Sequence, residues 1–195
     1  KMSTRKANFV TLDELCDDIG PDVLRYFFIM RGINSHLNFD LNLAKNQSDE
    51  NPVFYLQYAH ARICNIIKRA NGFGHEINLK AKLDLLDTEI EQLLIRKIIQ
   101  FPELVENAGN LLEPQLIANY LQDLCTIFHK FYVLNKVISD DLDMTAARLV
   151  LAETSRILLS IANEKYEDYR YPINIIDWKT HQIEKPEFDD DKQNG

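Results

Sequence analysis

The spacing of the apolar residues is the feature that most constrains this chain. Over most of its length they recur three and four positions apart, the period of one face of an α-helix. The clearest run lies between positions 113 and 134 and contains Ile117, Leu121, Leu124, Phe128 and Phe131. Its intervals of four, three, four and three form one stripe, which we interpret as core packing. Only six Gly and six Pro occur in 195 residues, so we predict an all-α fold.

Local signals predict where the helices begin and end. Thr11 and Glu14 fit a capping box, in which each side chain satisfies a backbone N–H at a helix start. This helix should end at Gly20, and a second one should follow over residues 21–30 because Pro21 suits the first turn. Asn51 and Pro52 start a longer helix that reaches about residue 70. Further helices are expected at 41–47, 87–100, 113–134 and 143–162, with a shorter one starting at residue 101.

Charge and cysteine content exclude several classes of protein. The net charge of −8 argues against a surface that binds polyanions all over, so any nucleic-acid contact must be local. Three widely separated cysteines without a C-x-x-C pair support neither a disulfide framework nor a zinc site. No apolar run approaches the roughly 20 residues of a membrane span, and residues 1–20 lack a signal-peptide core. We therefore expect a cytoplasmic protein without membrane association.

The common catalytic motifs are missing from the sequence. It contains no G-x-G-x-x-G, G-x-x-x-x-G-K-[ST], H-E-x-x-H or G-x-S-x-G, the motifs of phosphate-binding loops, zinc proteases and nucleophile elbows. The five histidines show no i, i+4 pairing, so no metal site is predicted. Carboxylate pairs on the helices are interpreted as solvated surface rather than as general acid and base.

Four stretches and the first five residues together resemble a known family. The chain begins with Lys1, Met2, Ser3, Thr4 and Arg5, and it continues with NFVTL, RYFFIMR, SHLNFDLNLAK and NPVFYLQYAHAR. In this order and spacing they resemble arginyl-tRNA synthetase, a class I enzyme, from its KMSKS loop into its helical DALR anticodon-binding domain. The resemblance covers roughly residues 1–160. It implies that residues 1–5 lie over the phosphates of ATP, where a cation favours the transition state of adenylate formation.

The resemblance implies that the chain is divided into three parts. Residues 1–40 form the KMSKS-like loop and a small two-helix connector, and residues 41–162 form the anticodon-binding bundle. About six or seven helices are expected. Residues 163–195 form a divergent, partly disordered tail, which could replace the family's C-terminal contacts with RNA, cap the bundle or be unrelated to RNA.

The helix at residues 51–70 is the predicted RNA-binding element. Aromatic rings bind unstacked bases and nearby cations hold phosphates. The candidate residues are Asn51, Tyr55, Gln57, Tyr58, His60, Arg62, Lys68 and Arg69. The family resemblance implies that the pair Tyr55 and Tyr58 meets the anticodon loop, the cations follow from their place on the same helix, and Asn51 and Gln57 could read base edges. The alternative is that both tyrosines pack in the bundle, that Asn51 is only a helix cap and that the cations are solvated. Arg148 and Arg156, in the last helix, could face the RNA backbone or water.

Several positions depart from the family pattern. Thr4 stands where many class I enzymes have a second lysine, and Ala7 stands where the family usually has Gly. Asn38 and Asn42 replace the usual aspartates, and the sequence leaves the pattern after about Ser160. Roles of the family's C-terminal tail are therefore not transferred.

The whole enzyme implied by the resemblance joins arginine to its tRNA. ATP and Mg²⁺ would bind mainly outside this chain, in an N-terminal catalytic domain that does not precede Lys1, so the fragment alone is expected to be inactive. Its expected partners are arginine tRNAs and that domain, and we expect a monomer. The alternatives are a standalone helical RNA-binding module and a protein-interaction scaffold without catalysis.

Overall fold

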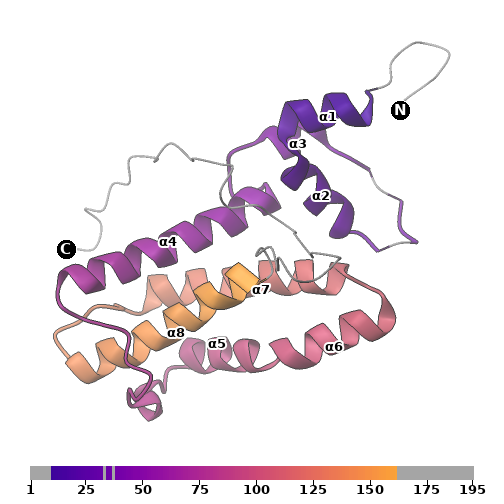
Figure 1. The fold of residues 1–195 in the computed structure, drawn as a ribbon. Helices are drawn as coiled ribbons and strands as arrows, with labels where there is room; N and C mark the ends of the chain where they lie inside the picture. The colour runs from indigo at the N-terminus through magenta and orange to yellow at the C-terminus, as the bar shows by residue number, and fades with distance from the viewer. Residues whose placement is uncertain (1–9, 33, 37, 162–195) are drawn as a thin grey trace, which may run out of the picture.

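A computed structural model describes residues 10–161 except residues 33 and 37, and this part of the chain is helical (Figure 1). Its α-helices are α1 (Leu12–Ile19), α2 (Pro21–Ile29), α3 (Leu41–Lys45), α4 (Pro52–Gly72), α5 (Glu89–Ile99), α6 (Phe101–Leu111), α7 (Gln115–Leu134) and α8 (Leu142–Ile161). The all-α prediction is confirmed. The described part has eight α-helices rather than the total of six or seven expected, and each of the eight corresponds to a segment predicted from the local signals. The predicted loop at residues 1–5 and the tail lie outside the described residues.

The predicted capping signals start their helices as expected. The Thr11 hydroxyl accepts a bond from the Glu14 N–H at 3.2 Å, and the Glu14 carboxylate accepts one from the Thr11 N–H at 2.8 Å. Asn51 caps α4 by accepting from the N–H groups of Val53 and Phe54. Gly20 links α1 to α2 with a φ of 83°, a conformation that glycine adopts at little cost.

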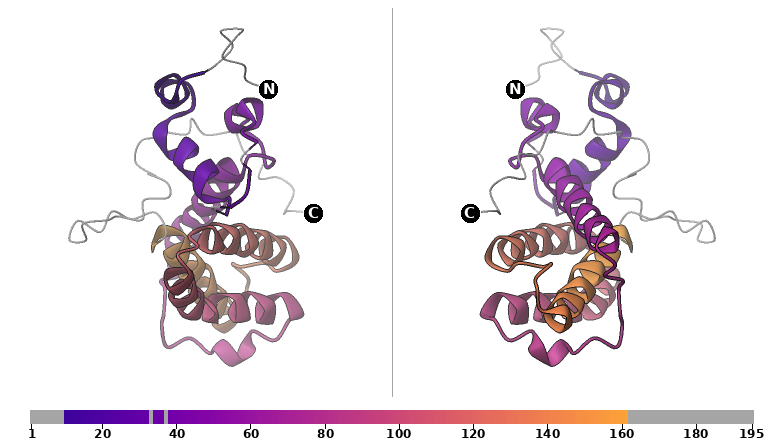
Figure 2. Two further views of the ribbon diagram at one scale, coloured as in Figure 1. Left: turned by 90° about the vertical axis from the view of Figure 1, so that its right-hand side faces the viewer. Right: turned by 90° about the vertical axis from the view of Figure 1, so that its left-hand side faces the viewer.

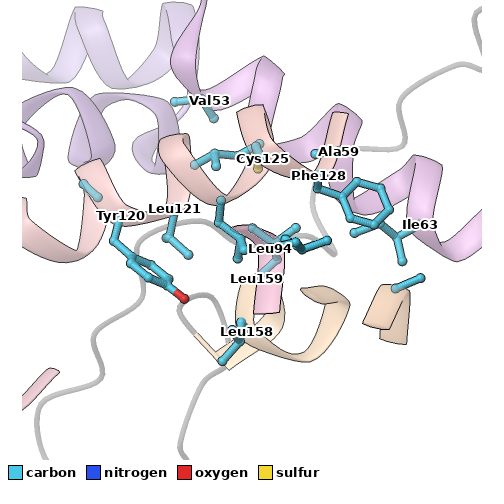
Figure 3. Packing of buried hydrophobic residues seen from close by; sticks show 14 of the residues in the cluster. Val53, Ala59, Ile63, Leu94, Tyr120, Leu121, Cys125, Phe128, Leu158 and Leu159 are labelled. Carbon is cyan, nitrogen blue, oxygen red and sulfur yellow. The ribbon is translucent and has the colours of Figure 1, made fainter. Parts of the chain in front are cut away.

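The stripe on α7 forms the centre of the core. All five of its residues are buried, and α7 packs against α4, α5, α6 and α8. Figure 3 shows Leu121 and Phe128 of α7 close to Leu94 of α5, Ile63 of α4 and Leu159 of α8. The stripe therefore has the packing role predicted from its spacing.

The connector formed by α1, α2 and α3 adjoins the first turns of α4 (Figures 1 and 2). Tyr26 of α2 is fully buried, and its hydroxyl donates to the carbonyl of Ala118 on α7 at 3.2 Å. Gln122 of α7 donates from Nε2 to the Tyr26 hydroxyl at 2.9 Å and to the carbonyl of Pro52 at 2.7 Å. One amide thus joins α2, α4 and α7.

Other local features were not predicted from the sequence. A short 3₁₀ helix at Leu83–Leu85 precedes α5, and α4 continues to Gly72. Leu112 ends α6 in the left-handed conformation with a φ of 55°, which is uncommon for a non-glycine residue. None of the described helices has the length and apolar character needed to cross a bilayer.

Candidate RNA-binding surface

A seam of polar contacts runs between α4 and α7. It starts at the bond from Gln122 to the carbonyl of Pro52, continues beside Tyr55 and Thr126, and reaches Arg62 and His129 further along both helices. Burial raises the pKa of Tyr55, although a hydrogen bond with Thr126 lowers it in part. Both helices advance in the same direction along this seam, so their successive turns face each other.

Five residues along this seam form a cluster of rings around one cation. We call Phe54, Tyr58 and Arg62 of α4, with His129 and Tyr132 of α7, the Arg62 cluster. The rings of Phe54 and Tyr58 are stacked, with centroids 6.3 Å apart and an interplanar angle of 11°. The Arg62 guanidinium lies 4.4 Å from the centroid of Tyr58 and 5.0 Å from that of Tyr132. It also donates to the Tyr58 hydroxyl.

His129 fixes the guanidinium from the α7 side. Arg62 Nη1 lies 2.7 Å from His129 Nδ1. Because a guanidinium has only donors, Nδ1 must accept and the proton of the neutral ring is on Nε2. Burial and the charge of Arg62 lower the pKa of His129, while the charge of Asp49 acts in the opposite direction. At neutral pH the cluster therefore carries one positive charge, on Arg62.

Arg62 forms no salt bridge with a carboxylate among the described residues, although the charge of Asp49 acts on the neighbouring His129. The salt bridges formed there involve Lys45, Lys82, Lys97, Arg148 and Arg156, and not Arg62. Lys68 and Arg69, two turns further along α4, are exposed. Arg69 lies over the ring of Phe73, 5.9 Å from its centroid. This flank of α4 thus presents rings and cations to solvent.

Three predicted site residues lie away from this surface. Asn51 is buried, and its Nδ2 donates to the carbonyls of Ala44 and Asn46 at 3.1 and 2.8 Å, so the structure supports the capping alternative. Gln57 is buried in the bundle. His60 points to α8, where its Nε2 lies 3.3 Å from the Ser160 hydroxyl.

His60 is also not a cation at neutral pH. Burial and, to a lesser extent, the charge of Arg156 lower its pKa to about 4, although Glu153 acts in the opposite direction. Its neighbour on the next turn, Cys64, has its thiol 3.8 Å from His60 Nδ1. This flank of α4 is an interhelical contact, whereas the flank with Tyr58 and Arg62 is partly open.

Arg148 and Arg156 of α8 both form ion pairs with glutamates. Arg148 Nε donates to Glu91 at 2.7 Å, and its other nitrogens donate to Lys136 O and Asn135 Oδ1. Arg156 makes two bonds of 2.7 Å to Glu153, one turn earlier on α8. The Arg148 pair is largely buried, whereas the Arg156 pair is partly exposed, and whether either arginine contacts RNA stays a prediction.

Sequence reasoning missed three members of the Arg62 cluster: Phe54, His129 and Tyr132. Phe54 could have been found, because it precedes Tyr58 by four positions on the same helix. His129 and Tyr132 could not, since nothing in the sequence pairs the turns of α7 with those of α4. No group of three or more potential metal ligands occurs within the described residues.

Comparison with known proteins identifies the class of domain. Residues 56–163 match the DALR anticodon binding domain, and this region contains most of α4 and all of α5 to α8. The chain therefore belongs to the DALR anticodon-binding domain family. The expected family and its helical fold are both confirmed.

The matching curated relatives are arginine–tRNA ligases. The enzyme of Heliobacterium modesticaldum is 48% identical over 165 residues, and that of Salinibacter ruber is 45% identical over 159 residues. Each match covers 82% of this chain but only 29% and 28% of the relative. The chain thus spans less than a third of the length of these enzymes.

Solved structures show the same helical arrangement. An arginyl-tRNA synthetase structure from Campylobacter jejuni aligns with a TM-score of 0.65 and 30% identity, over 82% of this chain and 36% of that one. An arginyl-tRNA synthetase from Plasmodium falciparum aligns with a TM-score of 0.57 over 77% of this chain and 26% of that one. Its identity is 23%, so this second likeness concerns the fold alone.

Proposed function

We propose that this chain is the anticodon-binding part of an arginine–tRNA ligase, and that the Arg62 cluster contacts the anticodon loop of arginine tRNA. The observation that carries the proposal is a positive charge held among aromatic rings at a partly open surface, without a carboxylate partner in the described part of the chain. Rings bind unstacked bases through their faces, and guanidinium groups bind phosphates.

The exposed cations extend this surface along α4. Lys68 and Arg69 lie beyond Arg62 in the direction of the helix C-terminus, where phosphates of the anticodon stem would be held by charge alone. The chain as a whole is acidic, so these cations define a local binding strip. Tyr55, half-buried beside Thr126, supports the strip from within the bundle.

The enzymatic role belongs to the intact ligase. In this proposal residues 1–5 act as its KMSKS-like loop, ATP and Mg²⁺ bind mainly in a separate catalytic domain, and the protein acts in the cytoplasm. The chain alone is expected to lack arginine activation. ATP–pyrophosphate exchange with arginine, measured on this chain and on a chain joined to a class I catalytic domain of the same family, tests this division.

Binding of an arginine tRNA transcript tests the RNA part of the proposal. We expect salt-dependent binding by the 195-residue chain and weaker binding by the Tyr58→Ala variant. If neither protein binds the transcript even at low salt, the proposal is contradicted and a protein-interaction scaffold is favoured. Binding to any structured RNA with equal affinity would favour the standalone RNA-binding module.

A further inference from the structure

Arg62 covers aromatic faces that the proposed RNA ligand would need. Phe54, Tyr58 and Arg62 are spaced by four, so they form a ladder along one side of α4. Phe54 stacks on Tyr58, and the Arg62 guanidinium lies over Tyr58 and also over Tyr132 of α7. A base that stacks on Tyr58 and Tyr132 therefore meets the Arg62 guanidinium, which already lies over these rings.

A guanidinium suits this position because it resembles a base in two respects. It is planar and delocalised, and it stacks on aromatic faces as bases do. We propose that Arg62 occupies, in the RNA-free protein, the place beside Tyr58 and Tyr132 that an unstacked base takes in the complex. The base displaces the guanidinium, which then pairs with a phosphate of the same loop. This inference rests on the proposed function and adds an exchange step to it.

The contacts that hold Arg62 are of a kind that can be exchanged. Its partners are two phenol rings, the Tyr58 hydroxyl and the neutral His129 ring, and none of them carries a negative charge. A phosphate offers a full charge and a charge-assisted hydrogen bond instead. The guanidinium thus exchanges neutral partners for an anionic one, while the rings exchange one planar group for another.

Arg148 shows what a permanently held arginine looks like in the same molecule. Its guanidinium is bound to Glu91, whose side chain is fully buried, and to two further oxygen acceptors. Releasing it would leave a buried carboxylate without its cation, which is costly. Releasing Arg62 withdraws a donor only from His129 Nδ1 and the Tyr58 hydroxyl, two neutral groups on half-buried side chains.

The arginine Nε–Hε signals in NMR spectra report this exchange directly. A nucleus over an aromatic face is shifted upfield by the ring current, so we expect the Arg62 Hε signal upfield in the 195-residue chain. The Arg62→Lys variant identifies the signal by its loss. An arginine tRNA anticodon stem–loop is then titrated, and Arg62 Hε is expected to move downfield as the complex forms. The Arg148 signal is the internal control and should not move.

A modified RNA separates base stacking from phosphate binding. Stem–loops in which one loop nucleotide at a time is abasic keep their phosphates, so they still bind but lack one ring. For the nucleotide that displaces Arg62, the abasic version should bind and leave Arg62 Hε upfield.

Two outcomes overturn the inference and are distinguishable from each other. If the unmodified stem–loop binds and Arg62 Hε stays upfield, the exchange does not occur, although the proposed function stands. If the stem–loop does not bind even at low salt, both the exchange and the proposed function are contradicted.

Discussion

Arg62 and Arg148 lie in one helical bundle but have opposite surroundings. Arg148 of α8 is bound to the fully buried Glu91 at 2.7 Å, and its remaining donors reach two further oxygen atoms. Arg62 of α4 is surrounded by Tyr58, Tyr132 and His129. The charge of Arg148 is neutralised inside the protein, whereas Arg62 forms no salt bridge with a carboxylate among the described residues.

From these different partners we predict a structural role for Arg148 and a binding role for Arg62. Glu91 caps α5 through Thr88 and reaches across to Arg148. Burial raises the pKa of Glu91, but hydrogen bonds from Thr88 and Arg148 outweigh burial, so its pKa is lowered. The Glu91 carboxylate, with its several donors, therefore stabilises the fold together with Arg148. Arg62, whose partners are neutral, makes no comparable ion pair in the described part of the chain.

The largest expected effect comes from removing the cation of the buried pair. The Arg148→Ala variant leaves Glu91 without its cation, which should lower the free energy of unfolding by about 3–5 kcal/mol. Urea unfolding followed by circular dichroism measures this. Lys82→Ala, which removes an exposed ion pair with Asp143, is the control and should unfold as the wild type does. Equal midpoints for the two variants would contradict a structural role of Arg148.

Acid should destabilise the fold because His60, on the flank of α4 that faces α8, is held neutral. The pKa of His60 is lowered to about 4 in the folded protein, while in the unfolded chain it is near 6.5. The unfolded state therefore binds this proton more readily, so stability is lost as the pH falls from 6.5 towards 4, by at most about 1.4 kcal/mol per pH unit.

A matched pair of variants isolates this contribution. His60→Gln should flatten the decline in unfolding free energy between pH 6.5 and 4. His36→Gln, at an exposed position of the connector, should leave it unchanged. An identical pH profile for wild type and His60→Gln would show that His60 is not the group responsible.

Removing the Tyr58 ring should weaken RNA binding without a comparable loss of stability. Stacking on an aromatic side chain contributes about 1–3 kcal/mol per base, so the affinity of Tyr58→Ala for the anticodon stem–loop should fall by that amount. Tyr58→Phe keeps the ring and should retain most of the affinity. Fluorescence anisotropy with a labelled stem–loop measures both. If Phe and Ala weaken binding equally, stacking is not the source of the affinity.

The smallest effect concerns the charge of Arg62. Each phosphate contact to single-stranded RNA contributes about 0.7 to the slope of log affinity against log salt concentration. Arg62→Gln should lower that slope by about this amount, whereas Arg62→Lys should preserve it. Unchanged slopes in both variants would mean that Arg62 contacts no phosphate.

Much of the fold was predictable because its signals are local. The stripe from Ile117 to Phe131 and the capping box of Thr11 and Glu14 are set by neighbours within one helix. The left-handed Leu112 was not predictable, since a leucine carries no signal for that conformation.

The candidate site was predictable only in part. Tyr58, Arg62, Lys68 and Arg69 follow from one helix and the family resemblance. His129 and Tyr132 come from another helix, and only tertiary packing brings them to Arg62. The same reason explains Arg148, whose partner Glu91 is 57 positions away along the chain.

Photo-crosslinking tests the contrast between the two arginines most directly. An arginine tRNA anticodon stem–loop that carries photoreactive uridines in its loop is irradiated with the 195-residue chain, and the crosslinked residues are identified by mass spectrometry. We predict crosslinks at Tyr58 and Tyr132, reduced by unlabelled stem–loop. Crosslinks confined to the surface around Arg148, with none in the Arg62 cluster, would contradict the account.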